Sequence, residues 1–312
     1  MSITTNKFLT FVCQPLIKLT WFTSEHNPEL VIKARYLTRF HRPIRLDPPV
    51  DMNEKILYLS LRTDTTKWTE LADKYRVRKY VEECGLSDCL VKLYGFWKTA
   101  DEIDFDKLPN SFILKAVQGS GDPVIVKDKS KFDKEKALKY MRKVYTKRYG
   151  GLEAGKHYMR IEPGIIAEEF LENDEVSKKV SNTLIDYKIW CINGRAEYIW
   201  ACCNRTPPHG IEVLTYDRDW NVHPEYSVFD SIYRKGSPMP APANLNGMLE
   251  VAEKLAKPFP IVRVDLYNLN GKIYFGEMTF TSLGGLQTFY SQEFLNKVGA
   301  MIDISDYYPK KQ

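Results

Sequence analysis

Residues 112–128 of the chain read FILKAVQGSGDPVIVKD. The first six residues, FILKAV, have the short apolar character of a strand, and the closing VIVKD is β-branched, as in a returning strand. Between them, QGSGDP has the composition of a turn or loop. Because this glycine loop leads into a strand and not into a helix, the stretch is not the start of a Rossmann βαβ unit.

The residues that follow extend this pattern. The sequence FDKEKALKYMRKVYTKRY (132–149) places apolar residues on one helical face and Lys and Arg on the other, which predicts a helix. After a glycine-containing loop, EPGIIAEEFL (162–171) is a further strand candidate. The order strand, glycine loop, strand, helix, strand predicts a compact α+β lid.

Two more hairpins are predicted toward the C-terminus. Asn193-Gly194 separates the strand-like runs LIDYKIWCI and AEYIWACC, and Asn270-Gly271 divides VRVDLYNLNGKIYFGEMTF (262–280) in the same way. An Asn-Gly pair between two strand-like runs is a strong hairpin signal. Between the hairpins, residues 244–259 have a helical pattern that is stopped by Pro258.

The N-terminal part is less regular. Residues 1 to about 70 are aromatic and interrupted by prolines, so we expect short helices and loops there. An apolar period from Trp68 to Cys84 predicts a helix that Gly85 ends. The acidic, turn-rich DEIDFDKLPNS then indicates a boundary near residue 108. The expected parts are an N-terminal region, a lid subdomain with the glycine loop and a C-terminal subdomain, spanning 1–108, 109–178 and 179–312.

The composition of the 312-residue, 36.3 kDa chain is typical of a globular protein. Apolar residues make up 44% and charged residues 27%. Lys and Arg number 45 against 40 Asp and Glu, which gives a formal net charge of +5. So small a surplus argues against a dedicated nucleic-acid binder, but it allows a locally positive cleft for phosphate or carboxylate ligands.

Cysteine usage and hydropathy favour the cytoplasm. The six cysteines form no CxxC pair and no zinc-spaced set with histidine, so we expect reduced, mostly buried thiols. No apolar run reaches the ~18 residues that a membrane span needs. The N-terminal FLTFVCQPLIKLTWF is interrupted by polar residues and lacks a small-residue cleavage site, which makes it a poor signal peptide.

The glycine loop is the first feature that suggests chemistry. Gly119-Ser120-Gly121 exposes backbone amides that can close over phosphate oxygens, and Lys115 before it adds positive charge. The loop is not a Walker loop, because no Gly-Lys-Ser/Thr follows, and it does not read GxGxxG. Taken alone, an ordinary hairpin turn also explains it.

The hairpin at 262–280 carries a second set of polar residues. Side chains alternate along a strand, so Arg263 and Asp265 share one face, and Glu277 and Thr279 share one face of the next strand. If the turn folds the strands together, two carboxylates and an arginine converge. Carboxylates bind Mg²⁺ together with nucleotide phosphates, and a nearby arginine neutralises a phosphoryl group in transfer. The alternative is a cross-strand ion pair on the sheet surface. The apolar flanking residues instead favour a buried strand, in which charged side chains are costly unless they are paired or bind a ligand.

Two shorter motifs complete the set. Glu168 and Glu169 end the apolar run IIAEEFL. They are either a solvated strand end or a site in which one carboxylate accepts a hydrogen bond from an adenine amino group. Asp186-Tyr187-Lys188 stands at the head of a strand, where a semi-buried lysine suits a phosphate or carboxylate partner.

In this order, the motifs resemble those of an ATP-grasp enzyme over roughly residues 72–286. The amino-acid sequences of these motifs look like those of the TupA-like branch, which is associated with teichuronopeptide and other capsular-polysaccharide biosynthesis. The segments that carry the resemblance are ADKYRVRKYVEECG, LPNSFILKAVQGSG, IIAEEFL, DYKIWCINGRAEYI, YDRDWN and RVDLYNLNGKIYFGEMTFTSLGG. The resemblance implies an α+β ATP-grasp fold, in which two α+β subdomains clamp the nucleotide and an additional N-terminal region precedes them.

The resemblance also implies roles for single residues. Lys115 would contact a nucleotide phosphate, and the loop Gly119, Ser120 and Gly121 would close over the phosphates. Lys188 would contact phosphate after the hinge, and Arg263 would stabilise the transition state that forms an acyl phosphate. The other implied nucleotide contacts are the adenine hinge Glu168, Glu169, Phe170 and Leu171, the ribose-binding Glu175 and the basic Lys74.

The implied cofactors are ATP and Mg²⁺. Asp265 and Glu277 correspond to the carboxylates that hold the metal. The usual third ligand is an asparagine two residues after the glutamate, and Thr279 stands there in this chain. A hydroxyl or a water would fill the place, which leaves the number of metal ions open.

The implied reaction is ATP-dependent carboxylate–amine ligation through an acyl phosphate. The branch suggests a uronic-acid carboxylate of a surface polysaccharide or its precursor, joined to an amino acid or another amine. Arg205, His209 and Lys188 would suit such an anionic sugar. The expected setting is the cytoplasm, with no nucleic-acid partner and with peripheral association with the capsule assembly machinery.

A glycosyltransferase of a capsular-polysaccharide pathway is the alternative function. It would need a DxD-like metal site, and DRD (217–219) does occur. That tripeptide lies in the polar turn YDRDWN, where it more simply shapes a loop. A non-catalytic nucleotide-binding scaffold is disfavoured by the joint presence of Arg263, Asp265 and Glu277.

Overall fold

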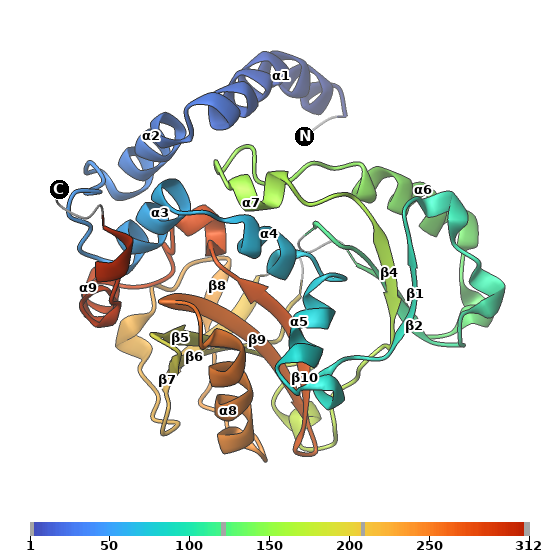
Figure 1. The fold of residues 1–312 in the computed structure, drawn as a ribbon. Coiled ribbons are helices and arrows are strands. Elements are labelled where there is room, and N and C mark those ends of the chain that lie inside the picture. The colour runs from blue at the N-terminus through green and yellow to red at the C-terminus, as the bar shows by residue number, and fades with distance from the viewer. Residues whose placement is uncertain (1–2, 120–122, 207–209, 309–312) are drawn as a thin grey trace.

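The chain folds into two β-sheets with helices around and between them (Figure 1). The computed structural model describes residues 3–119, 123–206 and 210–308. Ser120, Gly121 and His209 therefore lie outside the described residues. The combination of two separate sheets with helices confirms the mixed α and β class predicted from the sequence.

The smaller sheet contains the residues on both sides of the glycine loop. Its order is β1-β4-β2-β3, and every neighbouring pair is antiparallel. One face packs against α6 (Lys134–Tyr145), and the other carries Lys115 and Glu168. The four strands are β1 (Leu93–Trp97), β2 (Phe112–Ala116), β3 (Val124–Val126) and β4 (Ile165–Glu168).

The larger sheet has the order β10-β9-β5-β6-β7-β8, and only β7 and β8 are parallel neighbours. Helix α8 (Leu245–Ala256) packs against β5, β6 and β9. Both predicted Asn-Gly hairpins are confirmed, with positive φ at each of the four turn residues. The strands are β5 (Asp186–Ile192), β6 (Arg195–Cys203), β7 (Ile211–Asp217), β8 (Tyr233–Lys235), β9 (Ile261–Leu269) and β10 (Lys272–Thr279).

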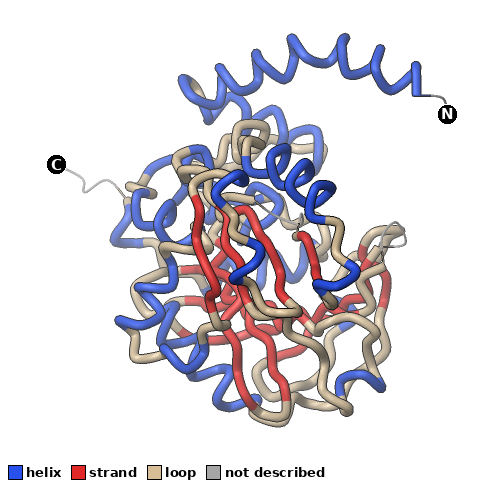
Figure 2. The backbone as a smooth tube through the Cα atoms, turned by 90° about the vertical axis from the view of Figure 1, so that its right-hand side faces the viewer, coloured by secondary structure: helices blue, strands red, loops and turns tan. Residues whose placement is uncertain are grey.

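Residues 3–83 are mostly helical. Figure 2 shows the first helix extending away from the rest of the molecule. None of the helices within the described residues is both long and apolar enough to cross a membrane. The helices not yet named are α1 (Ile3–His26), α2 (Pro28–Phe40), α3 (Met52–Arg62), α4 (Thr66–Ala72), α5 (Val77–Glu83), α7 (Lys156–Met159) and α9 (Gln292–Met301).

Two sequence-based expectations for this region were wrong. The N-terminal helices are longer than the short ones expected, since α1 has 24 residues and α2 has 13. The single helix expected from Trp68 to Cys84 is divided into α4 and α5. The Asp73 side chain causes the division, because it accepts hydrogen bonds from the backbone N–H groups of Tyr75 (2.8 Å) and Arg76 (3.1 Å).

The segment that contains α4 and α5 lies between the two sheets (Figure 1). Helix α4 contacts β10 of the larger sheet. From α5, Arg78 donates to Glu168 of the smaller sheet at 3.0 Å. This segment therefore contributes side chains to the space that both sheets border.

Candidate active site

Strands β9 and β10 bring four polar side chains to one face of the larger sheet. Asp265 lies directly opposite Glu277, and Arg263 lies directly opposite Thr279. Directly opposed residues of an antiparallel pair share a face and stand close enough for their side chains to interact. The structure thus brings together the four residues that the sequence placed on the two strands.

A bulge at Gly276 makes this arrangement possible. From the turn onward the strands pair regularly as far as Phe275 opposite Leu266, and the register shifts by one residue before Glu277. Without the shift, Gly276 would lie opposite Asp265 and Glu277 would point to the other face. A Cβ atom at position 276 would come within 2.9 Å of the Asp265 carbonyl oxygen, so only glycine fits without displacement.

Arg263 contacts most of these side chains. We call Arg263, Asp265, Glu277 and Thr279, together with Lys188 and Ser282, the Arg263 group. Its Nε and Nη2 donate to the two carboxylate oxygens of Asp265 at 2.7 and 2.8 Å. The same guanidinium donates to Ser282 Oγ at 2.7 Å, to Thr279 Oγ1 at 3.1 Å and to Glu277 Oε1 at 3.2 Å. A planar fork with this many partners is held in one orientation, which a flexible ammonium group could not match.

Lys188 joins the group from β5, where it is the direct neighbour of Asp265. Its Nζ donates to Asp265 Oδ2 and lies 3.7 Å from Asp186 Oδ2. Burial opposes the charged form, but the two carboxylates outweigh it and raise the pKa of Lys188. Lys188 is therefore a fixed cation at neutral pH, beside a second fixed cation, Arg263.

The two carboxylates of the group differ in their surroundings. The Asp265 side chain is 2% exposed and the Glu277 side chain 37%. Burial favours the neutral form of Asp265, but Arg263 and Lys188 outweigh it and lower the pKa of Asp265 to about 2. Asp265 thus anchors the two cations, whereas Glu277 presents a carboxylate toward the space between the sheets.

On the smaller sheet, Glu168 is bound on both sides by cations. Lys115 Nζ donates to Glu168 Oε2 at 2.9 Å, and Arg78 donates to Glu168 Oε1 at 3.0 Å. Glu168 is buried, so it is not the solvated strand end that was one of the two interpretations of IIAEEFL. The Lys115–Glu168 pair places two residues with implied nucleotide contacts next to each other.

Lys74 connects the two halves of the site. Its Nζ donates to the carbonyl oxygen of Gly119, the first residue of the glycine loop, and lies 3.9 Å from Glu277 Oε2. Burial lowers the pKa of Lys74, and the charge of Glu277 partly offsets this. One ammonium group therefore lies between Gly119 of the glycine loop and Glu277 of the larger sheet.

The remaining implied nucleotide contacts lie farther along the hinge. Phe170 lies under Lys127, whose Nζ is 5.4 Å from the ring centroid. Glu175, with a side chain that is 85% exposed, pairs with Lys178 at 2.7 Å. The Glu169 backbone N–H donates to Lys92 O at 2.9 Å, and Leu171 is half-buried. The structure does not bring these residues into contact with the Arg263 group.

Arg205, which the sequence proposed for an anionic sugar, lies beside the lysine of the site. It donates to Asp186 Oδ2 at 2.9 Å, and Asp186 is the carboxylate 3.7 Å from Lys188. The charge of Asp186, together with burial, also raises the pKa of Tyr267. Arg205 is therefore linked to the Arg263 group through Asp186 and Lys188.

Sequence reasoning missed three residues at the site. Arg78 binds Glu168, and Ser282 accepts from Arg263. Burial and the charge of Glu277 together raise the pKa of Tyr158, which belongs to α7. No local motif marks Arg78 or Tyr158. Ser282 lies in TSLGG directly after the strand, and this position was the only available signal for it.

The position of Ser282 is supported by the N-terminal helices. The backbone N–H of Gln287 donates to Asn53 Oδ1 of α3 at 3.1 Å, and Gln287 Nε2 donates to the Ser282 carbonyl oxygen at 3.3 Å. All three residues are buried. The orientation of Arg263 therefore depends on packing contacts with a helix more than 200 residues away in the sequence.

The oxygen donors of this site fit the implied Mg²⁺. Two carboxylates and the Thr279 hydroxyl are hard ligands of the kind that Mg²⁺ prefers, and Mg²⁺ at nucleotide sites commonly uses one or two carboxylates plus phosphate oxygens. Within the described part of the chain, no group of three or more His, Cys, Asp and Glu side chains is arranged to hold a metal ion. Asp265 and Glu277 would hold the metal, and Lys74, Lys115 and Lys188 would face the phosphates.

A buried histidine lies behind the site. His157 of α7 packs edge-on against Trp68, with ring centroids 5.6 Å apart, and its Nε2 lies 3.4 Å from Thr281 Oγ1. Its Nδ1 has no hydrogen-bond partner among the described residues. Burial lowers the pKa of His157 from 6.5 to about 3, so the ring is neutral in the folded protein at neutral pH.

This histidine is expected to make the protein less stable as the pH falls below about 6.5. Between that pH and about 3, the unfolded chain binds a proton at His157 that the folded chain does not. Each pH unit in this window costs about 1.4 kcal/mol of unfolding free energy. Urea unfolding at pH 7 and pH 5 should show a loss about 2 kcal/mol smaller in His157→Gln than in the wild type. Equal losses in both proteins would contradict the assignment.

Comparison with solved structures finds two ligases and a synthetase at low identity. D-alanine–D-alanine ligase from Bacillus anthracis, complexed with ATP, is 14% identical with a TM-score of 0.44, over 77% of this chain and 67% of that one. L-amino acid ligase from Bacillus licheniformis is 15% identical with a TM-score of 0.42, over 72% and 45%. N5-carboxyaminoimidazole ribonucleotide synthetase from Thermus thermophilus is 12% identical with a TM-score of 0.40, over 73% and 52%. The chain spans two thirds of the first protein's length and about half of the other two.

Comparison with curated proteins finds no match. The family profile described as TupA-like ATPgrasp matches residues 54–303. This range includes both sheets and every residue of the Arg263 group. Because the match extends over most of the sequence, the chain belongs to the TupA-like ATP-grasp family.

Proposed function

We propose that the protein is a carboxylate–amine ligase that uses ATP to form an amide through an acyl phosphate. The proposed carboxylate is a uronic acid of a capsular or other surface polysaccharide, or of its precursor, and the proposed amine is an amino acid or a similar compound. The reaction would take place in the cytoplasm, with peripheral association with the capsule assembly machinery. The family assignment supports the ligase class, and the polysaccharide substrate rests on the resemblance of the motifs.

The observation that carries the proposal is the group of Arg263, Lys188, Asp265 and Glu277 on one face of β5, β9 and β10. Two cations that are buried with one carboxylate, beside a second and more exposed carboxylate, suit a phosphoryl group that is bound with a divalent metal. A structural ion pair would not need the exposed Glu277 or the bulge that turns it to this face. The group therefore supports phosphoryl transfer more directly than a role in folding.

The contacts of each side chain suggest its role in the proposed reaction. ATP with Mg²⁺ supplies the phosphoryl group that turns a carboxylate oxygen into a leaving group. Lys115 and Lys74, on the glycine-loop side, would orient the phosphates, and Lys188 would do so from the larger sheet. Arg263, already locked by Asp265 and Ser282, needs no reorientation to stabilise charge that develops beside it. The closed lid would keep water away from the acyl phosphate.

The alternative glycosyltransferase function gains no support from the DRD tripeptide. Both oxygens of Asp217 accept hydrogen bonds within the turn, from the backbone of Asp219 and Asn221 and from the Asn221 side chain. Arg218 binds Glu253 of α8 at 2.7 Å. These contacts support the interpretation that the tripeptide shapes a loop.

An ADP-release assay tests the proposed function. Purified protein is incubated with Mg-ATP and panels of uronic acids and amines, and the products are identified by mass spectrometry. We expect ADP and phosphate to form only when a suitable carboxylate is present. With hydroxylamine in place of the amine, the acyl phosphate should be trapped as a hydroxamate. Formation of AMP and pyrophosphate, or of amide without ATP cleavage, would overturn the proposal, and release of UDP from a UDP-sugar would favour the glycosyltransferase.

A further inference from the structure

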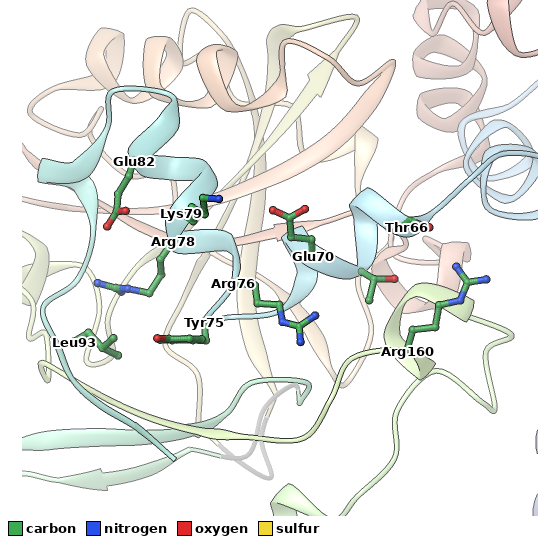
Figure 3. Close-up of a pocket in the computed structure, with 10 residues that line it drawn as sticks. Thr66, Glu70, Tyr75, Arg76, Arg78, Lys79, Glu82, Leu93 and Arg160 are labelled. Carbon is green, nitrogen blue, oxygen red and sulfur yellow. The ribbon is translucent and has the colours of Figure 1, made fainter. Parts of the chain in front are cut away.

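A cavity of about 790 Å³ opens along α4 and α5, apart from the Arg263 group. Figure 3 shows that its labelled side chains come from α4, from the link to α5, from α5 itself, from the start of β1 and from the end of α7. Its volume lies in the range of small-molecule sites. The lining residues are Thr66, Thr69, Glu70, Tyr75, Arg76, Arg78, Lys79, Glu82, Leu93 and Arg160.

The charged side chains of this cavity are mostly cationic. Three arginines and one lysine line it, against two glutamates. A concave surface with an excess of one charge raises the local concentration of ligands of the opposite charge. The guanidinium groups also match the two oxygens of a carboxylate or the oxygens of a phosphate.

Three of the four cations are available to a ligand. The Arg160 guanidinium forms no hydrogen bond or ion pair with any residue that the structure describes. Arg76 pairs at 3.2 Å with Glu162, whose side chain is 82% exposed, and also lies 3.7 Å from the buried Asp73. Lys79 pairs at 3.6 Å with the exposed Glu83. The exposed pairs with Glu162 and Glu83 contribute only about 0–1 kcal/mol each, so a bound anion can replace these two at little cost.

The fourth cation connects the cavity to the smaller sheet. Arg78 lines the cavity and at the same time holds Glu168 of β4 at 3.0 Å. Glu168 also binds Lys115, the lysine that precedes the glycine loop. A ligand that binds Arg78 in the cavity is therefore connected through Glu168 to Lys115, the proposed phosphate-binding lysine.

The cavity also has a flat apolar surface. The Tyr75 ring stacks on Phe96, with ring centroids 4.2 Å apart and planes inclined by 15°. Tyr75 lines the cavity beside Leu93, and the rings of Tyr75 and Phe96 are both partly exposed. Such a surface can pack against the C–H face of a sugar ring while the arginines bind its charged groups.

We propose that this cavity binds an oxyanion-bearing part of the substrate, remote from the carboxylate that reacts. This inference rests on the proposed function and gives it a second anchoring point for a long anionic substrate. The ligand chemistry is a sugar with a carboxylate or phosphate group, held by Arg76, Lys79 and Arg160. Its source is either a uronic-acid oligosaccharide or a sugar nucleotide, and the experiment below separates the two.

Calorimetric titration of the full chain, without ATP, tests the site. The probes are tetragalacturonate, which carries carboxylates, UDP-glucose, which carries only phosphates, and neutral maltotetraose. We expect one of the two anionic probes to bind, maltotetraose not to bind, and the affinity to fall with added NaCl. The anionic probe that binds identifies the source of the oxyanion. Binding of neither anionic probe, or equal binding of maltotetraose, would overturn the proposal.

Matched arginine variants place the binding in the cavity. Arg76→Gln combined with Arg160→Gln should weaken the binding of the anionic probe about tenfold or more, because two charge-assisted contacts are lost. Arg39→Gln combined with Arg195→Gln removes two exposed arginines outside the cavity and should leave the affinity unchanged. All four side chains are exposed, so both double variants should remain folded, and thermal unfolding checks this. An unchanged affinity in the first double variant would overturn the proposal.

The outcome is independent of the chemistry at the Arg263 group. Titrations of a Glu277→Gln variant should give the wild-type affinity for the anionic probe, because Glu277 does not line the cavity. Binding without any ADP formation would leave the cavity site standing and count against the ligase. Conversely, ADP formation with no dependence on Arg76 and Arg160 would count against the cavity alone.

Discussion

Glu277→Gln should abolish ADP formation while the protein remains folded. The substitution removes a negative charge that would face the metal and changes the shape of the side chain very little. The Glu277 side chain is 37% exposed, and its contacts with Arg263 and Thr279 are both 3.2 Å long, so the amide can be accommodated. ADP release measured over a range of Mg²⁺ concentrations, with the melting temperature as the check on folding, tests this expectation.

Asp265→Asn is a less specific test of the metal site than Glu277→Gln, because it is expected to affect stability as well as activity. Asp265 is buried and holds both Arg263 and Lys188, so its neutral replacement leaves two buried cations with too little negative charge. Removal of one partner from a buried ion pair typically costs about 3–5 kcal/mol. We therefore expect lower stability as well as lost activity in Asp265→Asn. Near wild-type turnover in Glu277→Gln over the whole range of Mg²⁺ concentrations, low ones included, would show that the metal assignment is wrong.

Arg263→Lys should lower the rate of the chemical step about a hundredfold. Arg263 makes directed contacts with Asp265, Ser282 and Thr279, and the ammonium of a lysine can reproduce only some of them. Loss of one preorganised donor to a transition-state charge typically costs about 3 kcal/mol. Because the interaction is proposed to act in the transition state, kcat and kcat/KM should fall together, with KM for ATP little changed.

Arg195→Lys provides the control for this substitution. Arg195 is exposed at the start of β6 and pairs there with Glu197 at 2.6 Å, so its replacement should leave all kinetic constants unchanged. Circular dichroism and thermal unfolding should show that Arg263→Lys is folded. A raised KM for ATP with unchanged kcat would mean that Arg263 binds the nucleotide in its ground state and does not act on the transferring group.

Much of the fold could be predicted from the sequence because its signals are local. The Asn-Gly turns, the alternation along β9 and the helical period of α6 each depend on a few neighbouring residues. The order of the motifs led to the ATP-grasp resemblance, and the family match confirms that resemblance and the fold class. The assigned roles of the single site residues stay predictions.

The parts that could not be predicted depend on contacts between distant segments. Arg78 and Glu168 are 90 residues apart, and nothing in either local sequence indicates that they meet. The division between α4 and α5 depends on one side chain, Asp73, which bonds to the backbone and overrides a continuous apolar period. The face on which Glu277 lies could not follow from alternation at all, since counting regularly from the Asn270-Gly271 turn places it opposite Val264.

The bulge at Gly276 therefore has a consequence for the design of variants of this protein. Positions before and after it follow different inside-outside rules, although they belong to one continuous strand. A mutant library designed as if β10 were a regular strand would assign the wrong face to every position after residue 276. It would treat core residues as site residues and site residues as core residues. A loop graft at the hairpin tip, by contrast, changes only the portion before the bulge and leaves the pairing of Glu277 and Thr279 untouched. The two portions of β10 can therefore be varied separately, and Gly276 marks the boundary between them.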